Sequence, residues 1–333
     1  MPGNASRVKK KKKSRLPLWL TIPIGIVLLA GSIWLCWHEL KAYSLSEATK
    51  VLGELSWWRI AGSLAATILG YFALIGHDVI ALQHLRKKIP LRRISLAAFI
   101  AYAYSNSAPV SFAVAGTLRL RYYSKNGLET ADIGRLTGIT LTTYALGLLT
   151  ASAAALTIGH FPIPHFLPFH LTSSVPLGIF ALLLLIGYVV WTSLRGKALG
   201  AKHHEALGPT LGFTASQIGI SLCDWLLSGA ALYVLMVPKH PLWFPVFFGV
   251  FILGQFVALI GQLPGGIGVF DAVMIWGLHG QVSPPATLAA LFGYRVIYFL
   301  LPLILATVML AATEGLGIRK RLLLRRGAPH RGS

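Results

Sequence analysis

The residues best suited to chemistry in this sequence are ionisable side chains placed inside apolar segments. Asp224 lies near the middle of an apolar segment over 211–236, and Asp271 follows a Pro-Gly-Gly break. Arg295 interrupts the apolar run over 286–312. A charge at the centre of a bilayer costs about 2.5–3.5 kcal/mol on insertion scales, so each of these residues needs a partner or a function. Inside a membrane, such groups bind charged headgroups, relay protons or pair with one another.

Asp224 shares one face of a predicted helix with other polar residues. Gln217, Ser221, Asp224 and Ser228 are spaced by four, three and four positions, and Thr214 extends the series. Residues three and four apart are neighbours on a helix surface. The stripe is typical either of a polar seam that joins two helices or of the lining of a functional cavity. A seam alone would not need a carboxylate, so both interpretations stay open.

Asp271 and Arg295 are expected to lie at the same depth. Nine positions separate Asp271 from the predicted hairpin end near Gly280, and nine separate Ala286 from Arg295. At about 1.5 Å per helical residue, both lie roughly 13 Å from that end. On antiparallel neighbouring helices, this predicts an Asp271–Arg295 ion pair or a shared polar network. The pair is either part of a substrate site or purely structural.

Two helix breaks stand in different parts of the chain. They are Leu263-Pro264-Gly265-Gly266-Ile267-Gly268 and Ser105-Asn106-Ser107-Ala108-Pro109. Backbone groups freed by a break are tolerated at membrane depth only where protein or a water-lined cavity covers them. Paired discontinuous helices are typical of transporter sites, and half-helix N-termini suit an anion such as lipid phosphate. Gly265 and Gly266 are therefore candidate substrate-binding residues.

Arg119 and Arg121 follow the break at 105–109, with Tyr122 and Tyr123 beside them. Guanidinium groups bind phosphate bidentately, and Tyr side chains suit the headgroup level. The alternative is an ordinary basic loop at the membrane interface. Asp78 stands near the predicted cytosolic end of its span, where we expect an interfacial position more than a part in the site.

The composition is that of a polytopic, all-α membrane protein. The chain has 333 residues, of which 55% are hydrophobic, and a mean hydropathy of +0.67. The 30 Lys and Arg against 10 Asp and Glu would suit nucleic-acid binding, but the basic residues cluster in short segments that flank apolar spans. That distribution follows the positive-inside rule and favours contact with anionic lipid. Cys36 and Cys223 both fall in apolar segments, which predicts neither a disulfide framework nor a metal site.

The charge distribution also predicts the topology. The predicted membrane spans are 16–38, 58–82, 133–158, 176–195, 211–236, 243–262, 266–279 and 286–313. The remaining apolar segment, 94–117, is placed as a re-entrant pair of half-helices, because that returns the basic residues after it to the cytosol. This fold, about eight spans with one or two re-entrant hairpins, puts 25 basic residues in the cytosol and 4 outside. Residues 1–15 and 316–333 are then basic cytosolic tails on a transmembrane domain over 16–315.

Motifs of ATP-driven or metal-dependent proteins are missing from the sequence. No Walker A, H-E-x-x-H or G-x-S-x-G pattern occurs, so ATP-driven pumping by this chain alone is not expected. His160, His165 and His170 share a loop over 159–174. Their spacing places them on different sides of a helix, which favours interfacial histidines over a metal site. We expect no cofactor and no metal.

Three stretches together resemble the membrane domain of bacterial lysylphosphatidylglycerol synthases and the stand-alone YbhN-like inner-membrane proteins. They are Gly116-x-x-Arg119-x-Arg121-x-Tyr123-Ser124-x-x-Gly127-Leu128, Pro264-Gly265-Gly266-Ile267-Gly268-x-x-Asp271-Ala272 and Tyr294-Arg295-Val296-x-Tyr298-x-x-x-Pro302. The resemblance covers about 60–315 and looks closest to the YbhN-like group. It implies two re-entrant hairpins and a membrane domain that moves aminoacylated phospholipid between leaflets. The position of Asp271 is often Glu in the family, so Asp keeps the charge but shortens the reach.

The resemblance also implies an absence. The synthases carry a soluble aminoacyl-transferase domain after the membrane domain, and this chain stops at Ser333. We therefore expect no lysyl-transferase activity, and no enzyme activity at all.

The favoured function is translocation or handling of phospholipid, with anionic headgroups, in the bacterial inner membrane. The candidate substrate-binding residues are Arg119, Arg121, Tyr123, Asp224, Gly265, Gly266, Asp271, Tyr294 and Arg295. One alternative is a non-transporting partner of lipid-modifying enzymes. A less favoured one is an intramembrane lipid transferase with Asp224 or Asp271 as base. A homo-oligomer and a lipid-enzyme partner both stay open, and nucleic acid is not an expected partner.

Overall fold

The computed structural model describes residue 53 and residues 55–107, 111–161, 172–200, 210–238, 240–261 and 268–326. Every regular element in these ranges is helical, which confirms the predicted all-α class. The elements are α3 (Trp57–His84), α4 (Leu91–Asn106), α5 (Ser111–Tyr123), a 3-10 turn (Ser124–Asn126), α6 (Thr130–Gly159), α7 (Val175–Gly200), α8 (Leu211–Tyr233), α9 (Phe244–Gly261), α10 (Val269–Gly277), α11 (Pro284–Tyr294), a π-helical segment (Arg295–Leu300) and α12 (Leu301–Arg326).

Four helices in the described ranges are long and apolar enough to cross a membrane. They are Trp57–His84, Thr130–Gly159, Val175–Leu194 and Pro284–Thr313, the last running through α11, the π-helical segment and α12. α9 is apolar but shorter. α10 has nine residues. At about 14 Å it is roughly half as long as a span, so the expected span over 266–279 was predicted too long. The predicted span 16–38 lies outside the described residues.

α3 and α8 lie antiparallel and in close contact. The facing pairs along them are Gly62 with Val234, Gly70 with Leu227, and Gly76 with Ile220. Small residues let helix backbones approach closely in membranes. At one end of the pair, the ring of His84 stacks on that of Phe213, with centroids 3.9 Å apart. The C-terminus of α3 therefore lies beside the N-terminus of α8.

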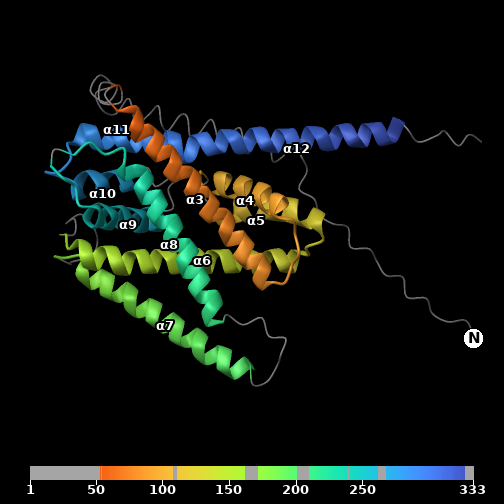
Figure 1. The fold of residues 1–333 in the computed structure, drawn as a ribbon, viewed down its shortest axis with the longest axis horizontal. Helices are drawn as coiled ribbons and strands as arrows, with labels where there is room; N and C mark the ends of the chain where they lie inside the picture. The colour runs from red at the N-terminus through yellow and green to blue at the C-terminus, as the bar shows by residue number, and fades with distance from the viewer. Residues whose placement is uncertain are drawn as a thin grey trace, which may run out of the picture.

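α6 is the central helix, packed against α7, α8 and α9 (Figure 1). It runs parallel to α8, because Thr143 contacts Gln217 and, one turn further, Gly147 contacts Ser221. A Cβ at position 147 would come 2.8 Å from the Ser221 carbonyl carbon, so only glycine allows this approach. The polar stripe of α8 thus faces α6.

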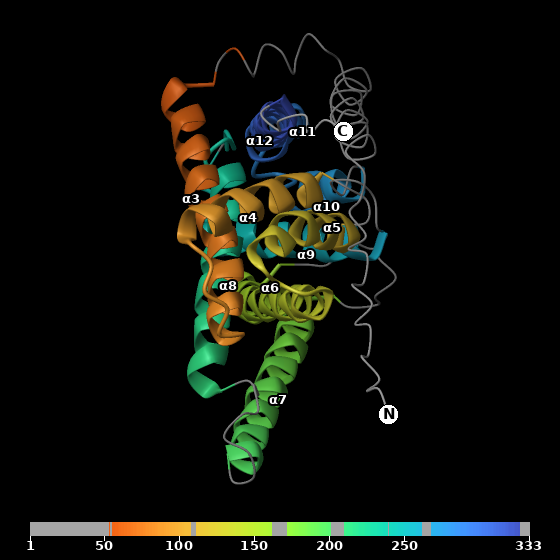
Figure 2. The same ribbon diagram turned by 90° about the vertical axis from the view of Figure 1, so that its right-hand side faces the viewer.

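Two helical hairpins lie between α12 and α6 (Figure 2). α4 and α5 pack together as the first, which contains most of the segment 94–117; its re-entrant placement stays a prediction. The Tyr104 hydroxyl of α4 shares a hydrogen bond of 3.0 Å with the Thr307 hydroxyl, which joins this hairpin to α12. α9 and α10 form the second, in which Gly254 faces Phe270. The two hairpins occupy opposite ends of the long helices (Figure 1).

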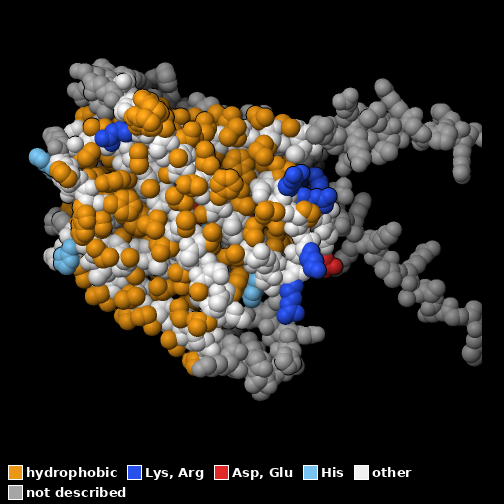
Figure 3. Space-filling model, viewed as in Figure 1, with side chains coloured by type: hydrophobic (Ala, Val, Ile, Leu, Met, Phe, Trp, Pro, Cys, Tyr) orange, Lys and Arg blue, Asp and Glu red, His pale blue; other side chains and the backbone are white. Residues whose placement is uncertain are grey.

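Basic side chains gather at one end of the molecule, on the right in Figure 3. We call it the basic end: it holds the C-termini of α3 and α5 and the N-termini of α4, α6 and α8. Its exposed or half-buried Lys and Arg are Arg86, Lys87, Lys88, Arg92, Arg93, Arg121, Lys125 and Arg135. At the opposite end, the Arg59 guanidinium donates to the Val234 carbonyl at 3.1 Å.

Two apolar clusters fill the interior. One joins α6, α8, α9, α10 and α11, and the other joins α3, α4, α5 and α12 with the start of α6. α7 differs, because most of its apolar side chains face outward, among them Phe180, Leu183 and Val190. A helix that is apolar all round is typical of a membrane span, so the outer face of α7 suits contact with lipid.

Candidate functional site

A buried group of charged and hydroxyl side chains forms where α3, α4 and α5 meet. Asp78 of α3 is fully buried and accepts two hydrogen bonds from the Arg119 guanidinium, from Nη2 at 2.6 Å and from Nε at 3.2 Å. The Tyr123 hydroxyl donates to the same carboxylate at 2.7 Å, and that of Tyr102 at 3.2 Å. A bidentate Arg–carboxylate pair with further donors is how a buried charge is satisfied. We call these four residues the Asp78 cluster.

The Asp78 cluster changes the interpretation of several predicted residues. The Asp78 side chain lies in the protein interior, and its expected position near the membrane interface stays a prediction. Arg119 and Tyr123 do come together, around the Asp78 carboxylate. Arg121 is half-buried and, two positions along α5, lies on another side of that helix. An acid in an apolar helix was the signal that could have placed Asp78. The substrate-binding role of these residues stays a prediction.

The predicted ion pair between Asp271 and Arg295 is confirmed. Arg295 Nη2 donates to both Asp271 carboxylate oxygens at 2.8 Å, and both side chains are buried. Asp271 Oδ2 also accepts from the backbone N–H of Gly268 at 2.8 Å, so the carboxylate caps the start of α10. Gly268 has φ +81°, which favours glycine. Gly265 and Gly266 lie outside the described residues.

Arg295 begins the π-helical segment between α11 and α12. Such segments are rare and frequently occur at functional sites. Within this one, Tyr298 is buried, and its backbone carbonyl accepts from the Tyr71 hydroxyl at 3.4 Å. The rings of Tyr294 and Tyr298 stack with centroids 5.0 Å apart. The segment therefore joins the Asp271–Arg295 pair to a group of buried tyrosines.

The polar stripe of α8 is buried along its length, which confirms the predicted common face. Its members are Thr214, Gln217, Ser221, Asp224 and Ser228. Gln217 Nε2 donates to the Thr143 hydroxyl at 2.8 Å. Ser228 shares a hydrogen bond with the Tyr294 hydroxyl at 2.8 Å. The stripe therefore touches α6 near the basic end and α11 nearer the opposite end.

Asp224 differs from the other buried carboxylates. Asp78 and Asp271 each bind an arginine, and Asp132 binds Lys87 at 2.7 Å. Within the described residues, no ion pair involves Asp224, and its Oδ1 has no hydrogen-bond partner. The same is true of three other stripe atoms, Thr214 Oγ1, Gln217 Oε1 and Ser221 Oγ. Buried polar groups in native proteins nearly always have partners, so the stripe is equipped to receive a polar ligand.

Five tyrosines lie within electrostatic reach of the Asp224 carboxylate. They are Tyr71, Tyr102, Tyr144, Tyr294 and Tyr298, from α3, α4, α6, α11 and the π-helical segment. The rings of Tyr71 and Tyr298 lie 5.9 Å apart between centroids. Among the predicted site residues, the structure thus brings Tyr294 close to Asp224. Their functional role stays a prediction.

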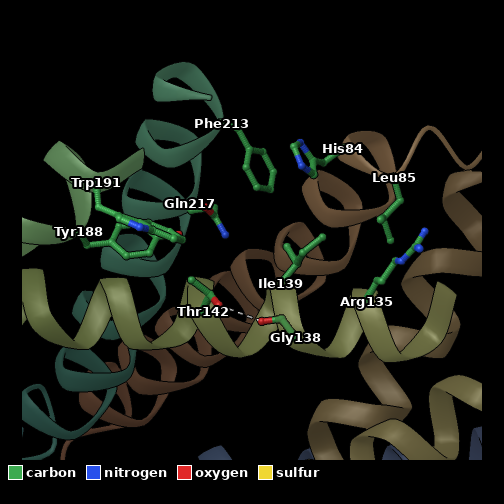
Figure 4. Close-up of a pocket in the computed structure, with 10 residues that line it drawn as sticks. All are labelled: His84, Leu85, Arg135, Gly138, Ile139, Thr142, Tyr188, Trp191, Phe213 and Gln217. Atoms are coloured by element: carbon green, nitrogen blue, oxygen red, sulfur yellow. Dashed lines mark hydrogen bonds between the residues drawn. The ribbon is translucent and has the colours of Figure 1, made fainter. Parts of the chain in front are cut away.

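A cavity of about 690 Å³ lies between α3, α6, α7 and α8 at the basic end (Figure 4). Its lining consists of His84, Leu85, Arg135, Gly138, Ile139, Thr142, Tyr188, Trp191, Phe213 and Gln217. Gln217 belongs both to the cavity and to the polar stripe. Sequence reasoning placed none of the other nine in a site, because they come from four helices and no local spacing links them.

A metal site finds no support in the part of the chain that the structure describes. That part contains no group of three His, Cys, Asp or Glu side chains that could hold a metal ion. Of the three loop histidines, His165 and His170 lie outside it.

The helical fold, the long apolar helices and the buried charges define a helical membrane protein. Residues 22–306 match the family described as the lysylphosphatidylglycerol synthase TM region, so the chain belongs to this family.

Curated relatives extend this assignment. The uncharacterized protein slr0712 of Synechocystis is 32% identical over 300 residues, which cover 89% of this chain and 92% of that protein. The inner membrane protein YbhN of Escherichia coli is 27% identical over 271 residues, or 80% of this chain and 84% of YbhN. The phosphatidylglycerol lysyltransferase of Staphylococcus xylosus is 26% identical over 309 residues. That match covers 90% of this chain but only 35% of the lysyltransferase.

Proposed function

We propose that this protein moves phospholipid between the two leaflets of the bacterial inner membrane and carries the headgroup along the polar stripe of α8. The observation that carries the proposal is the environment of Asp224. It is buried without a counter-cation among the described residues, whereas Asp78 and Asp271 are each neutralised by an arginine. An intramembrane acid is costly and is retained where it has a function. A passing headgroup would supply the partner that Asp224 lacks.

The arrangement of the stripe supports a path. Gln217, Ser221 and Asp224 follow one another on successive turns of α8 from the cavity toward the middle of the helix. α6 covers this face, so a headgroup passes only when α6 and α8 move apart. The tight contact of Gly147 with Ser221 is then the resting seal between the two helices.

The topology we propose has both termini in the cytosol and two re-entrant hairpins, α4–α5 and α9–α10. The eight predicted spans include the two limbs of the second hairpin. The basic end is the cytosolic end, as the positive-inside rule requires. The two buried ion pairs hold the hairpins: Arg119 of α5 is tied to α3, and Asp271 of α10 to the π-helical segment. In this resting state their role is positioning. Substrate contact falls to Asp224 and Tyr294.

Leaflet-resolved transport by the pure protein tests this proposal. Proteoliposomes carrying a trace of fluorescent phosphatidylglycerol are treated with a membrane-impermeant reductant, which reports the lipid that reaches the outer leaflet. We expect faster exchange than in protein-free vesicles, and a loss of about tenfold or more in Asp224→Asn, since a hydrogen bond to a charged group contributes about 1.5–3 kcal/mol. Cys223→Ser is the matched control, because Cys223 is the neighbouring residue on the exposed side of α8.

A second candidate function is that of a non-transporting partner of a lipid-modifying enzyme. The lysyltransferase match favours it, because this chain corresponds to about a third of that protein. Correctly folded protein that exchanges none of the common phospholipids would support the partner function and refute transport. We further propose that the chain is not an enzyme. A covalent change in the vesicle lipid, seen by mass spectrometry, would instead indicate an intramembrane transferase.

A further inference from the structure

We infer that the cavity at the basic end is a binding site for a phospholipid headgroup, held with its phosphate at Arg135 and its hydroxyl or ammonium group at Gln217. This inference deepens the proposed function by locating the loading site and by fixing the direction in which the headgroup lies. The cavity has a volume of about 690 Å³, within the range of ligand sites, about 300–1,000 Å³.

The outer part of the cavity provides one guanidinium group and one imidazole ring. Arg135 is exposed on the first turns of α6, and His84 closes the C-terminus of α3. The His84 ring stacks on Phe213, which fixes the imidazole at the cavity wall. A guanidinium binds a phosphate with charge-assisted hydrogen bonds. This end of the cavity therefore suits an anion.

The inner part of the cavity provides an acceptor. The Thr143 hydroxyl donates to the Ile139 carbonyl at 2.9 Å, so it can only accept from Gln217, whose Nε2 lies 2.8 Å away. This fixes the amide orientation and leaves Gln217 Oε1 as a buried acceptor with no partner among the described residues. A carbonyl oxygen binds a donor, such as a hydroxyl or an ammonium, and not a phosphate.

The walls between the two parts suit the rest of a lipid. Tyr188 and Trp191 of α7 line the cavity on one side, with ring centroids 5.8 Å apart. Both are partly exposed, on a helix whose outer face is apolar. Tyr and Trp are enriched at the headgroup level of a bilayer, with one face in lipid and a polar edge toward water. Acyl chains can thus leave the cavity past α7 while the headgroup stays inside.

Native mass spectrometry of the purified full-length protein in detergent tests the site by counting lipid adducts. The probes are phosphatidylglycerol, phosphatidylethanolamine and phosphatidylmethanol, whose headgroup has a phosphate but no further donor. Arg135→Gln should weaken binding of all three about tenfold or more. Gln217→Met should weaken phosphatidylglycerol and phosphatidylethanolamine and leave phosphatidylmethanol unchanged. Arg92→Gln, an exposed arginine at the same end but outside the cavity, should change none of them.

The inference is overturned if Arg135→Gln binds all three lipids as the unaltered protein does, or if Gln217→Met weakens phosphatidylmethanol as much as the others. Arg135 is exposed, so its variant is a fair test even where Gln217→Met fails to fold. Soluble glycerophosphoglycerol as competitor identifies the source: displacement of the adduct shows that the free headgroup is enough, and no displacement shows that the site requires an intact lipid. Binding without transport upholds the site and refutes the proposed function. Normal transport by the Arg135→Gln/Gln217→Met double variant upholds the proposed function and refutes the site.

Discussion

At the residue scale, the buried charges of this protein divide into paired and unpaired ones. Asp78 and Asp271 each hold an arginine through short hydrogen bonds, and each pair joins helices that are distant in sequence. Removing one partner from such a pair leaves an uncompensated buried charge, which typically costs about 3–5 kcal/mol. The paired acids thus stabilise the helix arrangement, while Asp224 has no ion-pair partner among the described residues.

The Asp271–Arg295 pair allows a direct test of its role. Asp271→Arg or Arg295→Asp alone should destabilise the protein by about 3–5 kcal/mol, and the double exchange should recover part of that loss. Recovery stays incomplete, because an arginine at position 271 cannot accept from the Gly268 N–H. The free energy of unfolding, measured by denaturant titration in micelles, checks this. A double variant that also regains full lipid transport would refute any substrate contact by either residue.

At the element scale, the α6–α8 contact depends on one glycine. Any Cβ at Gly147 would press against the Ser221 side chain and backbone, so Gly147→Ala forces the two helices apart. We expect a loss of about 1–3 kcal/mol, the usual cost of overpacking. Gly219→Ala is the control on α8, where an added Cβ meets no atom within 4 Å. Thermal denaturation followed by size-exclusion chromatography checks both variants, and equal stability would contradict the tight contact.

The same contact is expected to control transport. If α6 and α8 must separate for a headgroup to pass, Gly147→Ala should weaken the resting seal as well as the fold.

The π-helical segment is a second element with a local departure from regular geometry, and it carries both Arg295 and Tyr298. The close approach at Gly147 and the π-helical segment both place polar side chains in the interior through the path of the backbone.

At the scale of the whole molecule, charge divides the protein into two ends. After replacement of Cys36 and Cys223 by Ser, single cysteines at Arg92, Lys125 and His279 report which end faces the cytosol. A membrane-impermeant maleimide should label His279→Cys in intact cells, and Arg92→Cys and Lys125→Cys only after permeabilisation. Labelling of Arg92→Cys and Lys125→Cys from opposite sides would show that the segment 94–117 crosses the membrane once and is not re-entrant. Labelling of both cysteines from outside would show that the orientation is the inverse of the one proposed.

The sequence by itself determined the properties that depend on local order. Hydropathy predicted the membrane class, 3.6-residue periodicity placed Asp224 on a buried polar face, and the fixed helical rise put Asp271 level with Arg295. The tertiary structure alone decided which distant groups meet. Arg119 binds an acid 41 positions away on another helix, and the cavity draws its lining from four helices. Local patterns carry no record of helix crossing, so a prediction from spacing did not pair Asp78 with Arg119 and did not find the cavity.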